Sequence, residues 1–131
     1  MSKKMSTDTN AINWFEIAAN DIDRAKKFYE AIFDVQLTSM EMMGMKMAMF
    51  PPNGTNGTVG GSLVQSKMHK PGSGGTVLYL NANPDLESVL KRVEKAGGKI
   101  TMSKTLIDPN TGYMGFITDS EGNTVGLHSN N

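Results

Sequence analysis

The chain has no cysteine among its 131 residues, which excludes disulfide bonds, thiolate chemistry and cysteine-ligated zinc. It also has no excess of charge, since 13 basic residues balance 13 acidic ones. A neutral chain has no strong electrostatic attraction for nucleic acid or for an anionic membrane. Long apolar runs are missing too, so we expect neither a membrane-spanning helix nor a signal peptide. These absences favour a cytoplasmic protein.

The length is that of one domain with a substantial core. Residues 1–10 are polar and are predicted to form a flexible tail, while residues 11–131 form the domain.

The first half of the domain shows the pattern of a strand, a helix and three strands. Strands are expected at residues 12–19, 35–41, 45–50 and 58–65, and a helix at residues 21–33. In the first strand, Phe15 and Ile17 share one face with the helix, whereas Trp14, Glu16 and Ala18 point away from it. Asn20 or Asp21 can cap the helix.

The same pattern restarts after a connector at residues 66–75. Strands are predicted at 76–82, 99–103, 113–119 and 123–129, and a helix follows Asn83 as its cap, with Pro84 at its first position. Module one therefore spans residues 11–66 and module two residues 76–129. Residues 124–127 (TVGL) echo residues 58–61 (TVGG), which supports a duplication.

Two strand–helix pairs with apolar faces close one core by stacking on each other. We predict an α+β fold in which two paired βαβββ modules form a curved, partly open mixed sheet with a central cavity. The face turned away from the helices carries Trp14, Glu16, Tyr79 and Asn81, and such a mixture of aromatic and polar groups suits a ligand cavity.

At this point the chain resembles the vicinal oxygen chelate superfamily, which includes glyoxalase I, extradiol dioxygenases, fosfomycin-resistance enzymes and bleomycin-binding proteins. The resemblance is carried by residues 12–17 (INWFEI), 21–33, 48–51 (AMFP), 59–61 (VGG) and 119–123 (DSEGN). It is most similar to the glyoxalase-related branch, whose last strand reads Gly-Leu-His. The resemblance implies a small-molecule ligand and a homodimer.

Metal-dependent members place a ligand on the first and fourth strand of each module. By resemblance these positions fall on Trp14, Gly60, Val77 and Gly126, whose side chains are not the carboxylate or imidazole donors that divalent metals prefer. We therefore predict no metal cofactor. The alternative is a weak divalent-metal site, with donors from Glu16 and His128 completed by Gln65, Asp119 or water.

Two residues are candidates for catalysis. Glu16, if buried in an apolar cavity, is a proton acceptor, and His128 is a general base or hydrogen-bond partner on the cavity side of the last strand. The competing interpretations are a carboxylate that is paired or exposed, and a surface histidine. His69 lies in the connector and is interpreted as a solvent-exposed loop residue rather than a ligand.

Further residues are candidates for contact with a ligand. Trp14 is a cavity wall or stacking platform, and Tyr79, interpreted as the counterpart of Glu16 in the repeat, orients a ligand oxygen or packs in the wall. The predicted ligand-binding residues are Trp14, Met47, Met49, Ser62, Tyr79, Asn81 and Tyr113. Six methionines crowd residues 40–49; we expect at least half to fill the core, and the others to form an adaptable pocket wall or dimer face.

Three functions remain open from the sequence. The first is a lyase or isomerase related to lactoylglutathione lyase that acts on a small carbonyl compound without the usual metal site. The second is a non-catalytic protein that binds a bleomycin-type drug or another flat ligand. The third is a metal-dependent glyoxalase or extradiol dioxygenase. The fold alone does not choose among them, because it supports several chemistries.

Overall fold

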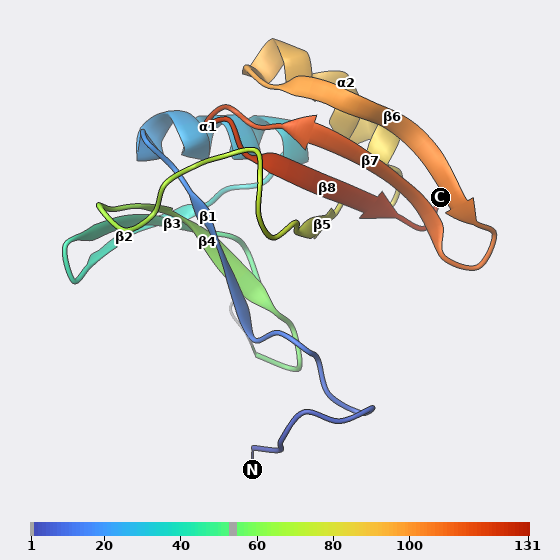
Figure 1. The fold of residues 1–131 in the computed structure, drawn as a ribbon, viewed down its shortest axis with the longest axis horizontal. Coiled ribbons are helices and arrows are strands. Elements are labelled where there is room, and N and C mark those ends of the chain that lie inside the picture. Colours follow the sequence, from blue (N-terminus) through green and yellow to red (C-terminus); the bar gives the residue numbers. More distant parts are fainter. Residues whose placement is uncertain (1, 53–54) are drawn as a thin grey trace.

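The order of strands and helices repeats once along the chain, as Figure 1 shows for a computed structural model that describes residues 2–52 and 55–131. The first module consists of β1 (Trp14–Ala18), α1 (Ile22–Phe33), β2 (Thr38–Met42), β3 (Met45–Met49) and β4 (Gly60–Gln65). The second consists of β5 (Tyr79–Asn81), α2 (Leu86–Ala96), β6 (Lys99–Asp108), β7 (Gly112–Thr118) and β8 (Thr124–Ser129). The predicted α+β class and the two βαβββ modules are confirmed. No helix in the described part of the chain is long and apolar enough to cross a membrane.

Each module folds into its own four-stranded mixed sheet. The strand orders are β1-β4-β3-β2 and β5-β8-β7-β6, so the two sheets have the same topology. The first strand of each module runs parallel to the fourth, and the other neighbours are antiparallel. Strands β1 and β5 therefore lie at equivalent edges of the two sheets.

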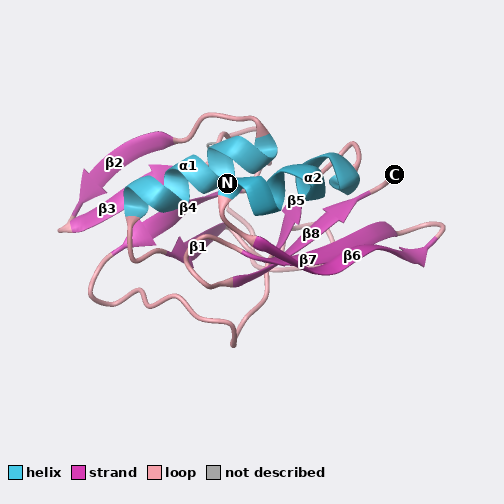
Figure 2. Ribbon diagram, turned by 90° about the horizontal axis from the view of Figure 1, so that it is seen from above, coloured by secondary structure: helices cyan, strands magenta, loops and turns pink. Residues whose placement is uncertain are grey.

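The two helices lie side by side and cover one face of the sheets (Figure 2). Their apolar stripes bury Phe28, Tyr29 and Ile32 from α1, and Leu86 and Leu90 from α2, against the inward faces of the strands. Hydrophobic burial of this kind is the main stabilising term in a domain of this size. The opposite faces of both sheets are left for other contacts.

Helix α1 begins where the sequence predicts, because the Asp21 side chain accepts a hydrogen bond from the Arg24 N–H at 3.1 Å. The predicted start of α2 is wrong. Its N-cap is Asp85, which accepts from the Glu87 N–H at 3.0 Å, and Pro84 precedes the helix. Asn83 instead accepts a hydrogen bond from the Asn130 N–H at 2.7 Å, a tertiary contact that its local sequence does not indicate.

Three strand boundaries differ from the predictions because pairing with neighbours decides where a strand ends. β5 contains only Tyr79–Asn81 instead of residues 76–82, and β2 is shifted to Thr38–Met42. β6 continues past residue 103 to Asp108, where it still pairs with β7 at Gly112. The expected turn at residues 108–112 is present, and the Asp108 carboxylate accepts hydrogen bonds from the N–H groups of Asn110 and Thr111.

The turn between β7 and β8 joins module two to module one. Asp119 is buried and accepts a hydrogen bond from the Tyr29 hydroxyl at 2.7 Å, and burial together with this carboxylate raises the pKa of Tyr29 well above its ordinary value. Asn123 donates through its side chain to the Ala18 carbonyl at 2.8 Å. The side chain of Glu121 accepts from the N–H groups of Asn20 and Asp21 at the start of α1.

Candidate functional site

The strand register places the candidate residues in matched pairs on the faces turned away from the helices. Trp14 of β1 lies opposite Gly60 of β4, and Tyr79 of β5 lies opposite Gly126 of β8. Tyr79 is therefore the counterpart of Trp14, not of Glu16 as predicted from the sequence. The assignment of Val77 to this position is wrong, since Val77 precedes β5 and belongs to no strand.

One step further along each pair, Glu16 lies opposite Ser62, and Asn81 lies opposite His128. Asn81 is thus the structural counterpart of Glu16. The sequence repeat alone left this register open, because the loop before α2 differs in length from the loop before α1.

Each of the two aromatic residues lies beside a glycine. At Gly126 the missing side chain makes room for the ring, because an added Cβ would lie 2.7 Å from Cδ2 of Tyr79. A Cβ at Gly60 would make an ordinary 3.4 Å contact with Cζ3 of Trp14 and would instead clash with the carbonyl oxygen of Pro52. Both rings remain partly accessible, with 38% of Trp14 and 51% of Tyr79 exposed. Tyr79 also contacts Phe116 of β7, with ring centroids 5.5 Å apart. The protein therefore presents one accessible aromatic ring on each sheet.

Glu16 is not buried in an apolar cavity: its side chain is 36% exposed and paired, which agrees with the competing interpretation. The identity of its partner was not predicted. Oε1 of Glu16 lies 2.7 Å from Nε2 of His69, whose side chain is only 20% exposed. Nδ1 of the same imidazole lies 2.7 Å from Oγ of Ser66. The interpretation of His69 as a solvent-exposed loop residue is therefore wrong: the turn that follows β4 folds His69 back onto β1.

A signal for this contact exists in the sequence, although it is weak. Ser62, Val64 and Ser66 alternate along one face of β4 and its continuation, which is also the face of Glu16. Locating His69 on the same face requires the geometry of the turn, where the N–H of Met68 donates to Ser66 Oγ at 3.0 Å and residues 66 and 69 form an isolated bridge.

His128 does not pair with Glu16. Its Nε2 lies 2.7 Å from the carbonyl oxygen of Thr111, and it belongs to β8, which makes no contact with β1. It does lie on the predicted face of its sheet, opposite Asn81 and beside Met114 of β7. The structure thus separates the two residues that the sequence joined as a catalytic pair.

Ser62 is fully buried, and its Oγ has no hydrogen-bonding partner among the described residues. In the sheet it lies between Glu16 of β1 and Met49 of β3. Buried polar atoms nearly always have a partner, so this hydroxyl is an exception within the described part of the sheet. Met47 occupies the same face one pair further along, opposite Val64, and is 5% exposed.

Tyr113 does not share this face. It has the same strand phase as Gly115, where an added Cβ would contact Leu86 and Leu90 of α2, and it packs against the core on the helix side. The Lys104 ammonium lies 4.5 Å above its ring. Its prediction as a ligand-binding residue at the cavity mouth therefore does not agree with its position.

The methionine hairpin is less buried than predicted. Of the six methionines at residues 40–49, only Met47 is buried, while Met40, Met42 and Met43 are 43%, 44% and 88% exposed. The cause is that β2 is the edge strand of its sheet and is exposed along its whole length. The expectation that at least half of them fill the core is wrong, and an accessible thioether surface remains.

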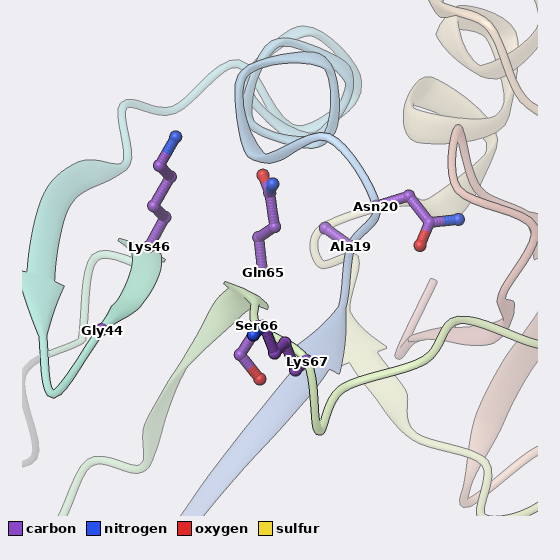
Figure 3. Close-up of a pocket in the computed structure, with 7 residues that line it drawn as sticks. All are labelled: Ala19, Asn20, Gly44, Lys46, Gln65, Ser66 and Lys67. Carbon is purple, nitrogen blue, oxygen red and sulfur yellow. The ribbon is translucent and has the colours of Figure 1, made fainter.

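The donors proposed for a weak metal site are engaged elsewhere. The Gln65 side chain accepts from the Ile22 N–H at 2.8 Å and points toward the start of α1 (Figure 3), and Asp119 binds Tyr29 and Asn123. Across residues 2–52 and 55–131, no three histidine or acidic side chains gather in a way that would hold a metal ion. The donor set at the family's metal positions, now Trp14, Gly60, Tyr79 and Gly126, does not fit a divalent cation, because only a phenol oxygen is offered.

A hollow of about 330 Å³ opens on the other side of this region, between α1 and the ends of β3 and β4. Figure 3 shows Lys46 and Gln65 directed toward α1, whereas the hydroxyl of Ser66 points the opposite way. Ser66 is among the residues that line this hollow, while its hydroxyl lies 2.7 Å from Nδ1 of His69.

The paired βαβββ modules, with matched positions on the first and fourth strand of each, define the architecture of vicinal oxygen chelate proteins. The chain belongs to the Glyoxalase/Bleomycin resistance protein/Dioxygenase superfamily, whose family profile matches residues 11–127.

Individual relatives are distant. A glyoxylase-like domain-containing protein of Didymella fabae is 28% identical over 123 residues, covering 86% of this chain and 88% of that protein. A glyoxylase/bleomycin resistance protein/dioxygenase domain from Frankia sp. EAN1pec superposes with a TM-score of 0.68 at 15% identity, over 92% of this chain and 97% of that one. TnmS3, an antibiotic-binding protein from Streptomyces sp. CB03234, superposes with a TM-score of 0.64 at 20% identity, over 95% of this chain and 98% of that one. At these identities the superpositions establish the shared fold.

Proposed function

We propose that the protein binds a small, flat, carbonyl-bearing organic molecule on the faces of Trp14 and Tyr79, and that it does so without a metal ion. The observation that carries this proposal is the aromatic ring beside a glycine at both equivalent positions. A ring face that is open to solvent is a stacking surface for a flat ligand, and such contacts contribute about 0.5–1.5 kcal/mol beyond the buried area.

The metal-independent part of the proposal is supported by donor chemistry. Relatives that use a metal need carboxylate or imidazole groups at four positions, and this chain offers indole, phenol and two glycines there. Glu16 and His69 are true donors, but they bind each other and leave a site one ligand short of the usual three.

The chemistry that we propose is proton transfer of the lyase or isomerase type, with the Glu16–His69 pair supplying the base. A carboxylate paired with an imidazole keeps a proton acceptor and a proton donor within one hydrogen bond, next to the Trp14 platform. Ligand sequestration without turnover is the second candidate, and the fold shared with the antibiotic-binding TnmS3 favours it. In that case the same aromatic faces act, and no residue needs to exchange a proton.

We further propose a homodimer, as the superfamily resemblance implies. Trp14 and Tyr79 lie on separate sheets of one chain, and β1 and β5 are edge strands that make no contact with each other. A second copy that places its β5 sheet over the β1 sheet of the first would bring a Trp14 face and a Tyr79 face to one cavity. Light scattering on the purified protein tests this, and a strict monomer at high concentration would contradict it.

Ligand binding is tested by the intrinsic fluorescence of Trp14, the only tryptophan in the sequence. A panel of quinones, flat aromatic carbonyl compounds and bleomycin-type drugs is titrated against the wild type and three variants. For any compound that binds, we expect Tyr79→Leu to lower the affinity about tenfold through the lost ring contact, and Tyr79→Phe to retain most of the affinity. Tyr113→Phe on the helix face is the control and should bind like the wild type.

Catalysis and sequestration are separated by Glu16→Gln. This variant should lose turnover of a bound ligand while its affinity stays within about threefold, because the amide keeps the shape of the carboxylate but cannot accept a proton. Metal analysis of protein purified without a chelator accompanies the assay. A stoichiometric, tightly held divalent ion would overturn the metal-independent proposal.

A further inference from the structure

We propose that Ser66 is the nucleophile of an acyl-transfer reaction, with His69 as its base and Glu16 as the residue that positions His69. This inference rests on the proposed binding of a carbonyl-bearing molecule, and it assigns to that molecule a different reaction from the lyase or isomerase chemistry proposed above, namely attack on an acyl carbon. The observation behind it is a continuous chain of two 2.7 Å hydrogen bonds, from Glu16 through His69 to Ser66.

The direction of these hydrogen bonds follows from the chemistry of the groups. An ionised carboxylate only accepts, so Nε2 of His69 must carry a hydrogen and donate it to Glu16. In the neutral imidazole Nδ1 then has a lone pair, and the Ser66 hydroxyl donates to it. A carboxylate that fixes the tautomer of an imidazole, which in turn accepts from a serine, is the arrangement that activates serine nucleophiles. In the usual triad Nε2 of the histidine faces the serine and Nδ1 faces the carboxylate, whereas here Nδ1 faces Ser66 and Nε2 faces Glu16.

The local backbone holds the serine with a lone pair still available. Ser66 Oγ accepts a hydrogen bond from the Met68 N–H at 3.0 Å and donates its own hydrogen to Nδ1 of His69. The bond from Met68 occupies one of the two lone pairs of the serine oxygen, so the other is available. The N–H of Lys67, directly after the nucleophile, lies outside every helix and strand and has no acceptor among the described residues. The amide that follows a nucleophilic serine is a recurrent oxyanion donor, so it is the group expected to stabilise the tetrahedral intermediate.

The reaction balances with water as the only co-reactant. Oγ of Ser66 bonds to the acyl carbon while its proton moves to Nδ1 of His69, and the imidazolium is stabilised by Glu16. The bond to the leaving oxygen or sulfur breaks as that atom takes the proton from Nδ1. Water then attacks the acyl-serine, gives its proton to Nδ1, and the Ser66 oxygen recovers it as the carboxylic acid departs.

The surroundings indicate the substrate class. Trp14 lies on the same face as Glu16, two residues earlier on β1, and the Ser62 hydroxyl opposite Glu16 is buried without a partner. Trp14 lies opposite Gly60, six residues before Ser66 along β4, which is a separation of about 20 Å along the strand. A flat group that stacks on the indole must therefore be joined to the acyl carbon by an extended linker. The predicted substrates are esters or thioesters of this extended kind.

The first test uses an alkyl fluorophosphonate probe, which forms a covalent adduct only with an activated serine. We expect one adduct per wild-type chain, mapped to Ser66 by peptide mass spectrometry, and none in Ser66→Ala. The matched control, Ser73→Ala in the same connector, should label like the wild type. His69→Gln should slow labelling by about 100-fold or more, the usual contribution of a general base. No adduct, or an adduct at another serine, would overturn the proposal.

A second test does not depend on the probe. The native chain has no cysteine, so Ser66→Cys and Ser73→Cys each introduce a single thiol. If His69 accepts a proton from position 66, iodoacetamide should alkylate Cys at that position at least tenfold faster than at position 73 below pH 8, and His69→Gln should remove the difference. Equal rates at the two positions would refute the proposed base.

The two proposals fail in different ways. Ligand-induced quenching of Trp14 fluorescence without labelling of Ser66 would leave the binding function standing and remove the acyl-transfer inference. Labelling of Ser66 that depends on His69, in a protein with no ligand response at Trp14, would support the nucleophile and contradict the aromatic binding site.

Discussion

Replacing Glu121 should lower the free energy of unfolding by weakening the contact between the two modules. This one carboxylate makes most of the polar contacts between the β7–β8 turn and the start of α1. Its side chain has no solvent exposure, and it accepts from Asn20 N–H at 2.8 Å, Asp21 N–H at 2.9 Å and Arg24 Nε at 2.7 Å. Burial alone would raise the pKa of Glu121, but the Arg24 guanidinium and the backbone donors outweigh it, so its pKa is lowered.

The size of the effect follows from which contacts each variant keeps. Glu121→Gln retains one carbonyl oxygen for the two N–H groups but turns an amide toward the guanidinium; losing a charged hydrogen bond costs about 1.5–3 kcal/mol, and we expect about 2 kcal/mol. Glu121→Ala leaves the two backbone N–H groups without an acceptor, while the half-exposed Arg24 turns to water; we expect a cost of about 4 kcal/mol. At roughly 4 °C per kcal/mol for a chain of this length, the melting temperatures should fall by about 8 °C and 16 °C.

Urea unfolding followed by circular dichroism at pH 7 and at pH 3 measures this difference. A carboxylate with a lowered folded-state pKa stabilises fully above its unfolded pKa of about 4.3, and the contribution disappears as the pH falls through the folded value. The loss of unfolding free energy in Glu121→Gln relative to the wild type should therefore be complete at pH 7, and it should shrink below about pH 4.3.

The control is Glu41→Gln on the exposed strand β2, which makes the same chemical change at the surface and should stay within about 0.5 kcal/mol of the wild type. Equal stability of the two variants at pH 7, or a Glu121→Gln deficit that is the same at both pH values, would refute this reasoning.

Three further predictions concern packing and exposure. Gly60→Ala would place a Cβ 2.0 Å from the carbonyl oxygen of Pro52, so the free energy of unfolding in urea should fall by at least about 2 kcal/mol. A variant within about 0.5 kcal/mol of the wild type would contradict this packing. Tyr29→Phe removes the donor to a buried carboxylate and should cost about 2 kcal/mol at pH 7 while leaving ligand titrations unchanged. Dilute peroxide should oxidise the 88% exposed Met43 well before the 5% exposed Met47, which peptide mass spectrometry measures; the reverse order would contradict the hairpin's orientation.

Much of the fold was predictable because it follows from short-range patterns. Alternating apolar residues marked β1 and β3, helical spacing marked α1, and the repeat of the whole order gave the two-module architecture. Element ends were less predictable. Asn83 is a residue type that often caps helices, but its side chain accepts from the Asn130 N–H instead. β6 extends to Asp108 because its pairing with the seven-residue β7 continues that far through three register shifts.

The candidate site was predictable in part. Strand phase correctly placed Trp14, Glu16, Ser62, Tyr79, Asn81 and His128 on the faces away from the helices. Two assignments were wrong, for different reasons. The family resemblance put Val77 at the position that Tyr79 occupies, a shift of two residues along the same face, because the loop before α2 is longer than the loop before α1. Glu16 and His128 were paired although they lie on separate sheets, which strand phase alone does not reveal.

The sequence by itself determined that this is a two-module α+β domain of the vicinal oxygen chelate type, since hydrophobic periodicity and turn residues act locally and leave few ways to bury two amphipathic helices. Three of the four positions assigned by resemblance, Trp14, Gly60 and Gly126, also follow from the sequence, while the fourth is occupied by Tyr79 and not by Val77. Only the tertiary structure decided which acidic and basic groups meet. The contact between Glu16 and His69 joins residues 53 positions apart through a turn whose geometry depends on backbone hydrogen bonds, and no pattern of residue types along the chain encodes that distance.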